Sequence, residues 1–325
     1  MRLLLNTQTD PAYNLALEEL LASESREETL MLWRNDNAII VGRNQNTAAE
    51  IDADFVRENH IQVVRRMTGG GAVYHDLGNI NYTIIAPGRQ LEHEAFSRNA
   101  TVIVKVLNSY GLDAGFQGRN DILLDGRKIS GSAKGVLNDR TLFHGTLLFD
   151  ADLSVLTQAL TPDESKIASK GIKSVRSRVA NIREYLPLFD LETFFADLQS
   201  RLAEQLGVFP EAIPEKLQCA AEILAQQKYR TWEWNYGSVM TYAYNWKARF
   251  ACGGVEICFN VKDNLIADMK ITGDFFGSRD VAELAANFNG VRPERNALLA
   301  VIAPVDIGNY IHGITADEFI SLFRI

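Results

Sequence analysis

Cysteine is scarce in this chain, and residues 1–218 contain none at all. The three cysteines, Cys219, Cys252 and Cys258, are odd in number and irregularly spaced, which is not the pattern of a disulfide framework. They form no C-x-x-C pair, and no H-E-x-x-H occurs, so these two metal-binding signatures are absent from the sequence. No cysteine nucleophile is therefore available in residues 1–218.

Long apolar runs are also missing, since none approaches the ~20 residues that span a bilayer. The leucines at 3–5 are too few for the apolar region of a signal peptide. We therefore expect an unprocessed cytoplasmic protein with no membrane partner. Positive charge is in deficit, with 33 Lys+Arg against 41 Asp+Glu, and this argues against nucleic acid as a partner, because such binding needs a basic field.

The length of 325 residues predicts about two domains, each large enough for its own core. Tryptophan and tyrosine are dense around 229–245, and there we place the junction between residues 1–243 and residues 244–325. Trp232, Trp234 and Trp246 are expected to pack at this junction. Hydrophobic periodicity predicts helices that alternate with short strands. The expected helices cover 11–21, 95–110, 191–206, 212–227, 281–288 and 315–323, and the expected strands 30–33, 38–41, 61–64, 73–74, 82–85, 122–124, 128–130, 146–149, 249–250, 255–261 and 265–272.

The densest motif is RRMTGGGAVYHD, residues 65–76, which follows an expected strand. Three consecutive glycines let the backbone approach a ligand and direct N–H groups at an anion. Arg65 and Arg66 alternate on an extended chain, so we expect one to face the ligand while the other packs or pairs. The motif is neither a Walker A loop nor G-x-G-x-x-G. An exposed glycine-rich turn remains the alternative.

A second motif, GRNDILLDGRKISGSA at 118–133, contains a hairpin signal at Asp125-Gly126. Strand alternation places Lys128 on the face opposite Arg127 and Ile129, and the small residues at 130–133 leave room beside it for a ligand. Taken alone, Lys128 could equally be a solvated hairpin lysine.

A third feature is the segment 166–178, in which five basic residues occur without an acidic one. It suits either a loop over a polyanion or a solvated surface. It lies in the one basic block of the chain, residues 61–180, with 15 basic and 11 acidic residues. Elsewhere, His144 is interpreted as a structural histidine. His75 and Asp76 do not form a relay, because adjacent strand residues point to opposite faces.

Together these motifs resemble lipoate–protein ligase A of the biotin/lipoate ligase superfamily. The similar segments are RRMTGGGAVYHDLGNINYTI, GRNDILLDGRKISGSA, FHGTLLFDADLSVL, SKGIKSVRSRVANI and the N-terminal PAYNLALEE. They occur in the family's order and cover most of residues 1–240. The resemblance implies an α+β fold, with a catalytic domain built on a mixed sheet flanked by helices and a small α/β C-terminal accessory domain.

The family activates lipoate with ATP to lipoyl-AMP and then transfers the lipoyl group to a lysine of a lipoyl-carrier domain. The resemblance assigns ATP to Arg66, Lys128 and the stretch Gly71, Ala72, Val73 and Tyr74. Lipoate is assigned to Lys128 and to an apolar slot at Gly70. Lys128 and Arg66 are the expected catalytic residues, with Lys128 acting as a fixed charge and not as a nucleophile. The 166–178 segment matches a loop that closes over the adenylate.

Mg²⁺ is expected with ATP, and Asp121 is one candidate ligand. The implied partners are lipoyl domains of 2-oxoacid dehydrogenase acyltransferase subunits or of the glycine-cleavage carrier protein. Met67-Thr68 stands where the family often has serine, and threonine keeps the hydroxyl. The alternatives are an ATP-independent lipoyl or octanoyl transferase, a biotin ligase and a non-catalytic lipoyl-carrier binding protein. The cysteine-dependent transferase mechanism has no nucleophile in residues 1–218.

Overall fold

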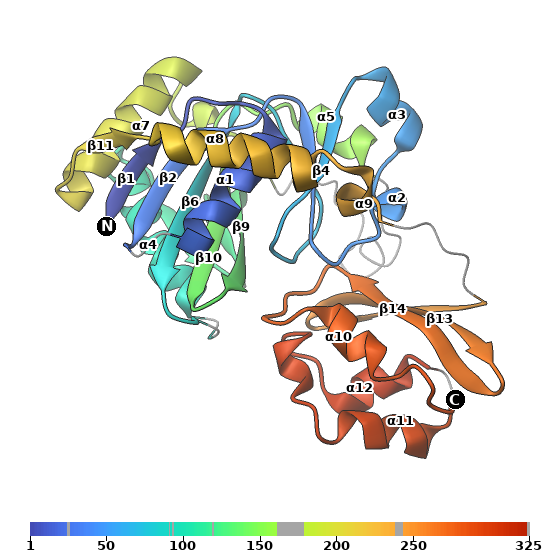
Figure 1. Ribbon diagram of the computed structural model, residues 1–325. Helices are drawn as coiled ribbons and strands as arrows, with labels where there is room; N and C mark the ends of the chain where they lie inside the picture. The colour runs from blue at the N-terminus through green and yellow to red at the C-terminus, as the bar shows by residue number, and fades with distance from the viewer. Residues whose placement is uncertain are drawn as a thin grey trace.

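The computed structural model describes residues 1–24, 27–90, 92, 94–118, 120–160, 179–237 and 243–323. A larger N-terminal part holds two sheets, and a smaller C-terminal unit, orange to red in Figure 1, lies beside it. Among the described residues, no helix is long and apolar enough to cross a membrane.

The main sheet has eight strands in the order β11-β1-β2-β6-β10-β9-β8-β7. It is mixed, because β1 runs parallel to both β2 and β11 whereas the other neighbouring pairs are antiparallel. This confirms the predicted mixed sheet. The strands are β1 (Arg2–Leu5), β2 (Thr29–Arg34), β6 (Asn79–Pro87), β7 (Ala114–Gln117), β8 (Asp121–Leu124), β9 (Arg127–Leu137), β10 (Arg140–Leu148) and β11 (Pro210–Ala212).

Helices cover both faces of this sheet, because its strands alternate apolar side chains between two cores. One core lies under α4 (Ala95–Asn108) and α7 (Leu191–Leu206), and the other under α1 (Pro11–Glu24) and α8 (Glu215–Leu224). The helix predicted at 212–227 begins at Glu215, since residues preceding Pro214 favour extended backbone and 210–212 form β11. A π-helical turn, η3 (Ala225–Tyr229), and α9 (Trp232–Asn235) follow α8.

A second, three-stranded sheet carries the glycine-rich motif, in the order β4-β3-β5. Its strands are β3 (Ala38–Val41), β4 (Gln62–Arg65) and β5 (Val73–His75), so the residues between β4 and β5 form a loop at its end. A small core beneath it includes Ile39, Val41 and Val56. The short helices around it are α2 (Thr47–Glu50), α3 (Ala53–Glu58) and α5 (Leu153–Ala159), and the 3₁₀ turn η2 (Ile182–Glu184) precedes α7.

The C-terminal unit has its own hydrophobic core, whose buried members all lie between Cys252 and Phe323. Its antiparallel sheet consists of β12 (Tyr244–Phe250), β13 (Gly253–Lys262) and β14 (Leu265–Gly273). The turn at Asp263 and Asn264 has the two positive φ angles of a tight hairpin, as its sequence predicts. Helices α10 (Val281–Ala286), α11 (Arg295–Ile302), the 3₁₀ turn η4 (Ile307–Asn309) and α12 (Ala316–Ser321) complete it.

Candidate functional site

The glycine-rich loop is folded around the guanidinium of Arg66. Arg66 is 5% exposed and donates to the carbonyl oxygens of Ile40 (3.0 Å), Gly69 (2.8 Å) and Gly71 (2.8 Å). Because peptide bonds are trans, carbonyls drawn inward at 69 and 71 turn the N–H groups of Gly70 and Ala72 away from Arg66. Arg66 therefore gives the loop the shape in which its backbone donors face outward.

Gly70 has the left-handed φ of +95° that this shape requires, a conformation in which a side chain would be strained. The following residues, Gly71, Ala72, Val73 and Tyr74, are each partly exposed and lead into β5. The Tyr74 hydroxyl donates to Asn37 Oδ1 (3.1 Å), and burial, with nearby carboxylates, raises the pKa of Tyr74 to about 12. The stretch predicted to hold ATP is thus partly exposed and includes a tyrosine that stays neutral near pH 7.

The side chain of Arg65, at the end of β4, has different hydrogen-bond partners from that of Arg66. Its guanidinium donates to the carbonyls of Gly42, Arg43, Gln45 and Asn235, and its Nε to that of Trp234. Sequence analysis expected one arginine to face a ligand, but both are buried and bound to main-chain oxygens in this structure. Burial lowers the pKa of each to about 10, so both remain cationic near neutral pH.

The tryptophans predicted to pack at the domain junction separate into three environments. Trp234 packs on the core under α1 and donates to the Arg65 carbonyl (2.8 Å). Trp232 is half exposed and stacks on Tyr236, whereas Trp246 packs against the C-terminal core. Only Trp234 contributes to the site, because it helps to fix the end of β4.

Lys128 lies on β9 with its side chain 38% exposed and its ammonium 2.8 Å from Asp121 Oδ1. A β-bulge between β8 and β9 brings Gly131 onto the same side, where an added methyl group would lie 2.8 Å from Lys128 Nζ. Of the small residues predicted beside Lys128, Gly131 is therefore the one that leaves room for the Lys128 side chain. The turn before it, Asp125-Gly126, has two positive φ angles, as predicted.

The main chain of Lys128 also anchors the segment that follows residue 178. Ala180 N–H donates to the Lys128 carbonyl (3.0 Å), and Val179 forms a parallel bridge with Lys128. Residues 166–178, which sequence analysis assigned to a loop over the adenylate, lie outside the described residues. The residues that follow this segment, Val179 and Ala180, nevertheless lie directly beside Lys128.

Strand β9 connects Lys128 to the glycine-rich loop. A methyl group at Gly135 would lie 3.1 Å from Thr68, at the start of that loop. Gly135 is seven residues from Lys128, which is about 20 Å at the rise of a β-strand. The described contacts therefore form two groups along this strand. One group holds Arg66, Gly69, Gly70 and Gly71, and the other holds Lys128, Asp121 and Gly131.

The C-terminal unit reaches the glycine-rich loop through a short segment after β14. Gly70 N–H donates to the Phe275 carbonyl (3.3 Å), and Gly273 N–H donates to the Asn44 carbonyl (2.7 Å). The Phe276 ring contacts the ring of Phe96, with centroids 5.9 Å apart. An ion pair, Arg43–Asp280 (2.9 Å), adds to this contact. Sequence analysis had not anticipated that the accessory unit would touch the predicted site.

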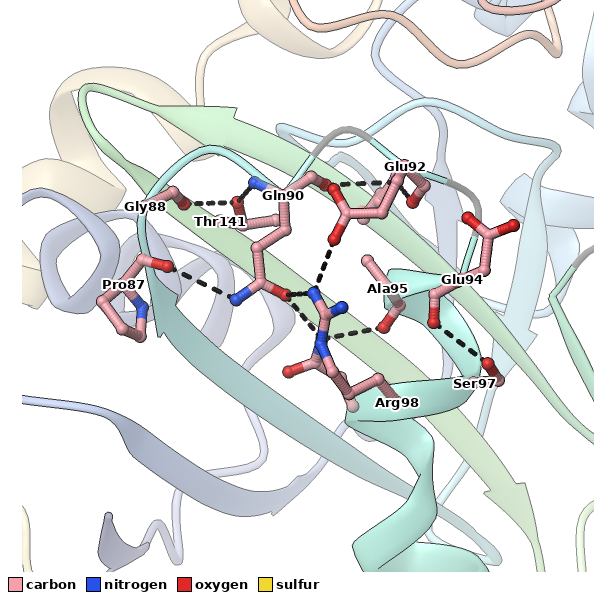
Figure 2. Close-up of polar contacts among 11 residues, drawn as sticks. Pro87, Gly88, Gln90, Glu92, Glu94, Ala95, Ser97, Arg98 and Thr141 are labelled. Carbon is pink, nitrogen blue, oxygen red and sulfur yellow. Dashed lines mark hydrogen bonds and ion pairs between the residues drawn. The ribbon is translucent and has the colours of Figure 1, made fainter.

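Phe96 is held in place by the connection between β6 and α4, shown in Figure 2. Gln90 accepts from Arg98 (2.7 Å) through its side chain, while its main-chain N–H donates to Thr141 (2.8 Å). Lys134 on β9 donates to the Gln90 carbonyl (3.2 Å) and lies 4.9 Å from the Phe96 ring centroid. Burial lowers the pKa of Lys134 to about 8. Phe96, on the first turn of α4, thus lies next to Lys134 and contacts Phe276 of the C-terminal unit.

His75 and Asp76 point to different surroundings, as predicted. His75 is buried and accepts from Asn35 Nδ2 at its Nδ1 (3.1 Å), and burial lowers its pKa to about 3. Asp76 instead caps the backbone at Asn79 (3.1 Å) and Asp152 (2.7 Å). The two side chains therefore form no relay.

Sequence analysis missed Glu18, a carboxylate 1% exposed within α1 and in contact with His144. A signal was available, because Asn14 and Glu18 are four residues apart and the residues before and between them in this helix are apolar. For a metal, the described part of the chain contains no group of three His, Cys, Asp or Glu side chains. Asp121, the candidate Mg²⁺ ligand, has Lys128 as its partner.

Comparison with protein families gives two adjoining matches. A family described as the lipoyl protein ligase A/B catalytic domain matches residues 10–205, and one described as the bacterial lipoate protein ligase C-terminus matches residues 240–323. Lipoate-protein ligase LplJ of Bacillus subtilis is 39% identical over 319 residues, which cover 96% of each chain.

Solved structures give a concordant result. P. falciparum LipL1 in complex with lipoate superposes with a TM-score of 0.81 at 26% identity, over 98% of each chain. Lipoate-protein ligase A bound with ATP superposes with a TM-score of 0.63 at 28% identity, over 73% of this chain and 99% of that one. A bipartite lipoate protein ligase of Thermoplasma acidophilum, described together with its E2 lipoyl domain as parts of an archaeal lipoylation system, gives 0.64 at 30% identity, over 75% of this chain and 98% of that one.

Proposed function

The chain belongs to the lipoate–protein ligase family, and from this premise we propose that it activates free lipoate with ATP and attaches the lipoyl group to a lysine of a lipoyl domain. Structures similar to this chain contain lipoate or ATP, and a similar archaeal ligase is described together with its E2 lipoyl domain, which supports each participant. The observation that carries the proposal is Lys128, a partly exposed cation on a rigid strand with Gly131 making room beside it.

In the first half-reaction, a lipoate carboxylate oxygen attacks the α-phosphorus of ATP, and pyrophosphate leaves with the electrons of the broken P–O bond. In the second, the neutral amine of the acceptor lysine attacks the acyl carbon, AMP leaves and the amine loses a proton. Both steps build negative charge on oxygens. Lys128 can stabilise this charge as a fixed cation, since the ammonium already holds a carboxylate at 2.8 Å.

We assign the nucleotide to Arg66, Lys128 and the partly exposed stretch Gly71 to Tyr74, and lipoate to Lys128 and Gly70. The geometry supports different modes of action for the two cations. Lys128 is accessible to substrate, whereas Arg66 shapes the loop through main-chain carbonyls and adds a buried positive charge.

Mg²⁺ is proposed to enter with ATP and to neutralise its phosphates while keeping several waters. Asp121 fits as a ligand of a hydrated ion only if it exchanges its present partner, Lys128, for the metal or for one of its waters. We further propose that residues 1–243 form the catalytic domain and residues 244–325 the accessory domain, and that the enzyme acts in the cytoplasm. The acceptor would be the lipoyl domain of an acyltransferase subunit or the glycine-cleavage carrier.

Substitution of Lys128 tests the proposal. Lys128→Ala should lower the rate of lipoyl-AMP formation by about 10²- to 10³-fold, the usual effect of removing one preorganised stabilising group. Lys216→Ala, which changes an exposed lysine on α8, is the matched control and should leave the rate unchanged. Circular dichroism would verify that both variants are folded. Wild-type turnover in Lys128→Ala would contradict the role of Lys128.

A further inference from the structure

A buried carboxylate forms the first part of a hydrogen-bonded chain beneath the glycine-rich loop. Glu18 on α1 accepts from the Thr83 hydroxyl (2.5 Å) and lies 3.0 and 3.1 Å from His144 Nδ1 through its two oxygens. Trp33 Nε1 in turn donates to Thr83 (2.7 Å). Glu18 is 1% exposed, so its carboxyl oxygens find their hydrogen-bond partners in these side chains and not in bulk water.

The second part of the chain connects His144 to the loop itself. His144 Nε2 lies 2.7 Å from the Thr68 hydroxyl, and Arg66 Nε donates to the same oxygen (3.1 Å). Thr68 is 1% exposed and immediately precedes the three glycines. Contacts therefore run without a break from α1, through β10, to the guanidinium that holds Gly69 and Gly71.

A neutral imidazole satisfies every contact in this chain with one arrangement of protons. Carboxylate oxygens only accept, so His144 Nδ1 carries a hydrogen and donates to Glu18. Arg66 Nε–H occupies one lone pair of the Thr68 oxygen, and the Thr68 hydrogen then points to His144 Nε2. Every donor from Arg66 to Glu18 then points in the same direction along the chain.

We propose that Glu18, His144 and Thr68 are positioning residues that set the orientation of Arg66 and, through it, the ligand-binding shape of the glycine-rich loop. The inference rests on the proposed function, since it concerns the loop to which we assign nucleotide and lipoate. Thr68 has the hydroxyl–imidazole–carboxylate geometry of a nucleophile, but its oxygen is buried and receives a hydrogen from Arg66. Its role is therefore to orient Arg66.

Charge balance supports the same role. The negative charge of Glu18 opposes the effect of burial on the pKa of Arg66. Among the described residues, the other charged or titratable groups that face this cluster are Arg65, His75 and Tyr229. Removal of the Glu18 charge would leave two arginines side by side without a buried counter-ion.

The decisive variant is Glu18→Gln, which keeps the shape and removes the charge. Both carboxylate oxygens lie beside His144 Nδ1, so either orientation of the amide places one oxygen and one NH₂ group there, without the negative charge. The preference for a proton on Nδ1 should weaken, and the Thr68 hydrogen loses its acceptor whenever the proton is on Nε2. We expect kcat/KM for lipoyl-AMP formation to fall about 10- to 100-fold, as when an outer-shell partner is removed, and the His144 ¹⁵N resonances to shift toward those of the Nε2–H tautomer.

Glu19→Gln is the matched control, because Glu19 lies next to Glu18 on α1 and pairs with Lys228 (2.7 Å) outside the chain of contacts. It should leave the tautomer and kcat/KM unchanged. A second pair, Thr68→Ser and Thr68→Val, decides the matter even where Glu18→Gln fails to fold. Serine retains the hydroxyl and should stay within about threefold of wild type, whereas valine should show the full loss.

Wild-type kcat/KM in Glu18→Gln or Thr68→Val would overturn the inference. An acyl ester on Thr68, trapped with lipoate and ATP and found by mass spectrometry, would also overturn it by making Thr68 the nucleophile. Should the wild-type protein form no lipoyl-AMP, the proposed function fails by itself. The His144 tautomer and the amide resonances of Gly70 and Ala72 still test the positioning role of Glu18, His144 and Thr68, because these measurements require no turnover. Unchanged resonances in Glu18→Gln would refute that role.

Discussion

At the residue scale, the adjacent arginines show how much of a side chain's direction the strand pattern predicts. Strand alternation predicts opposite directions for Arg65 and Arg66, and their side chains do serve different sides. The alternation rule ends with the strand, however, and β4 ends at Arg65. Arg66 begins the loop, so its direction is set by the carbonyls of Ile40, Gly69 and Gly71, which the sequence does not reveal.

A prediction at this scale concerns His75, whose pKa falls to about 3 through burial. The unfolded chain binds a proton near the ordinary histidine pKa of about 6.5, whereas the folded chain does not. The contribution of His75 to the free energy of unfolding is therefore fully present above pH 6.5. It is lost as pH falls toward 3, by up to about 1.4 kcal/mol per pH unit.

Urea unfolding at pH 7, 6 and 5 would measure this slope in the wild type and in His75→Gln. The variant should be less stable at pH 7 but should lose less stability on acidification. His60→Gln, at an exposed position, serves as control for the loss of a histidine. Equal slopes for wild type and His75→Gln would contradict the prediction.

At the element scale, the hairpin of β8 and β9 was predictable in part. Asp125-Gly126 fixes the turn, and alternation correctly separates Lys128 from Arg127. The bulge that brings Gly131 beside Lys128 was not predictable, because it depends on pairing with β8 and not on local residue preference. The contact of Val179 and Ala180 with Lys128 is equally invisible, since it joins residues some fifty positions apart.

Gly131→Ala is the test at this scale. The added methyl group would lie 2.8 Å from Lys128 Nζ, and the flexible lysine would give way before the strand does. We expect a folded protein in which lipoyl-AMP formation falls about 10-fold or more, since displacement of a charged group by about an ångström has effects of this size. Gly115→Ala is the control, because no atom lies within 4 Å of the new methyl group. Unchanged activity in Gly131→Ala would show that Lys128 does not depend on the space at Gly131.

At the scale of the whole molecule, the length predicted about two domains and the motifs predicted the family, but neither predicted where the accessory unit lies. Phe276 is 7% exposed and contacts Phe96 of the N-terminal part, and it lies outside the core of its own unit. Such a contact follows from the three-dimensional fit of two surfaces. The basic surplus of residues 61–180 includes Arg66 and Lys128, so the net charge of −8 conceals a local field suited to one nucleotide.

Gly69→Ala tests the contact between the two units. A methyl group at Gly69 would lie 2.3 Å from the Phe275 carbonyl, and backbone on both sides cannot yield as a flexible side chain could. We expect the C-terminal unit to be displaced, with faster limited proteolysis between the units and a larger radius of gyration in X-ray scattering. Gly115→Ala, on β7 with no atom within 4 Å of the new methyl group, would show the effect of a glycine change remote from this contact. Wild-type proteolysis and scattering in Gly69→Ala would contradict the observed seating.

The central claim is ATP-dependent transfer of lipoate to a protein lysine, and one assay tests it most directly. Purified protein, ATP, Mg²⁺ and free lipoate are incubated with an unmodified lipoyl domain, and the domain is weighed by intact mass spectrometry while pyrophosphate is measured. The account predicts one lipoyl group on one lysine, with one pyrophosphate released per group, and formation of both products about 10²- to 10³-fold more slowly in Lys128→Ala. Modification without ATP, from an octanoylated or lipoylated carrier alone, would contradict it and identify a transferase.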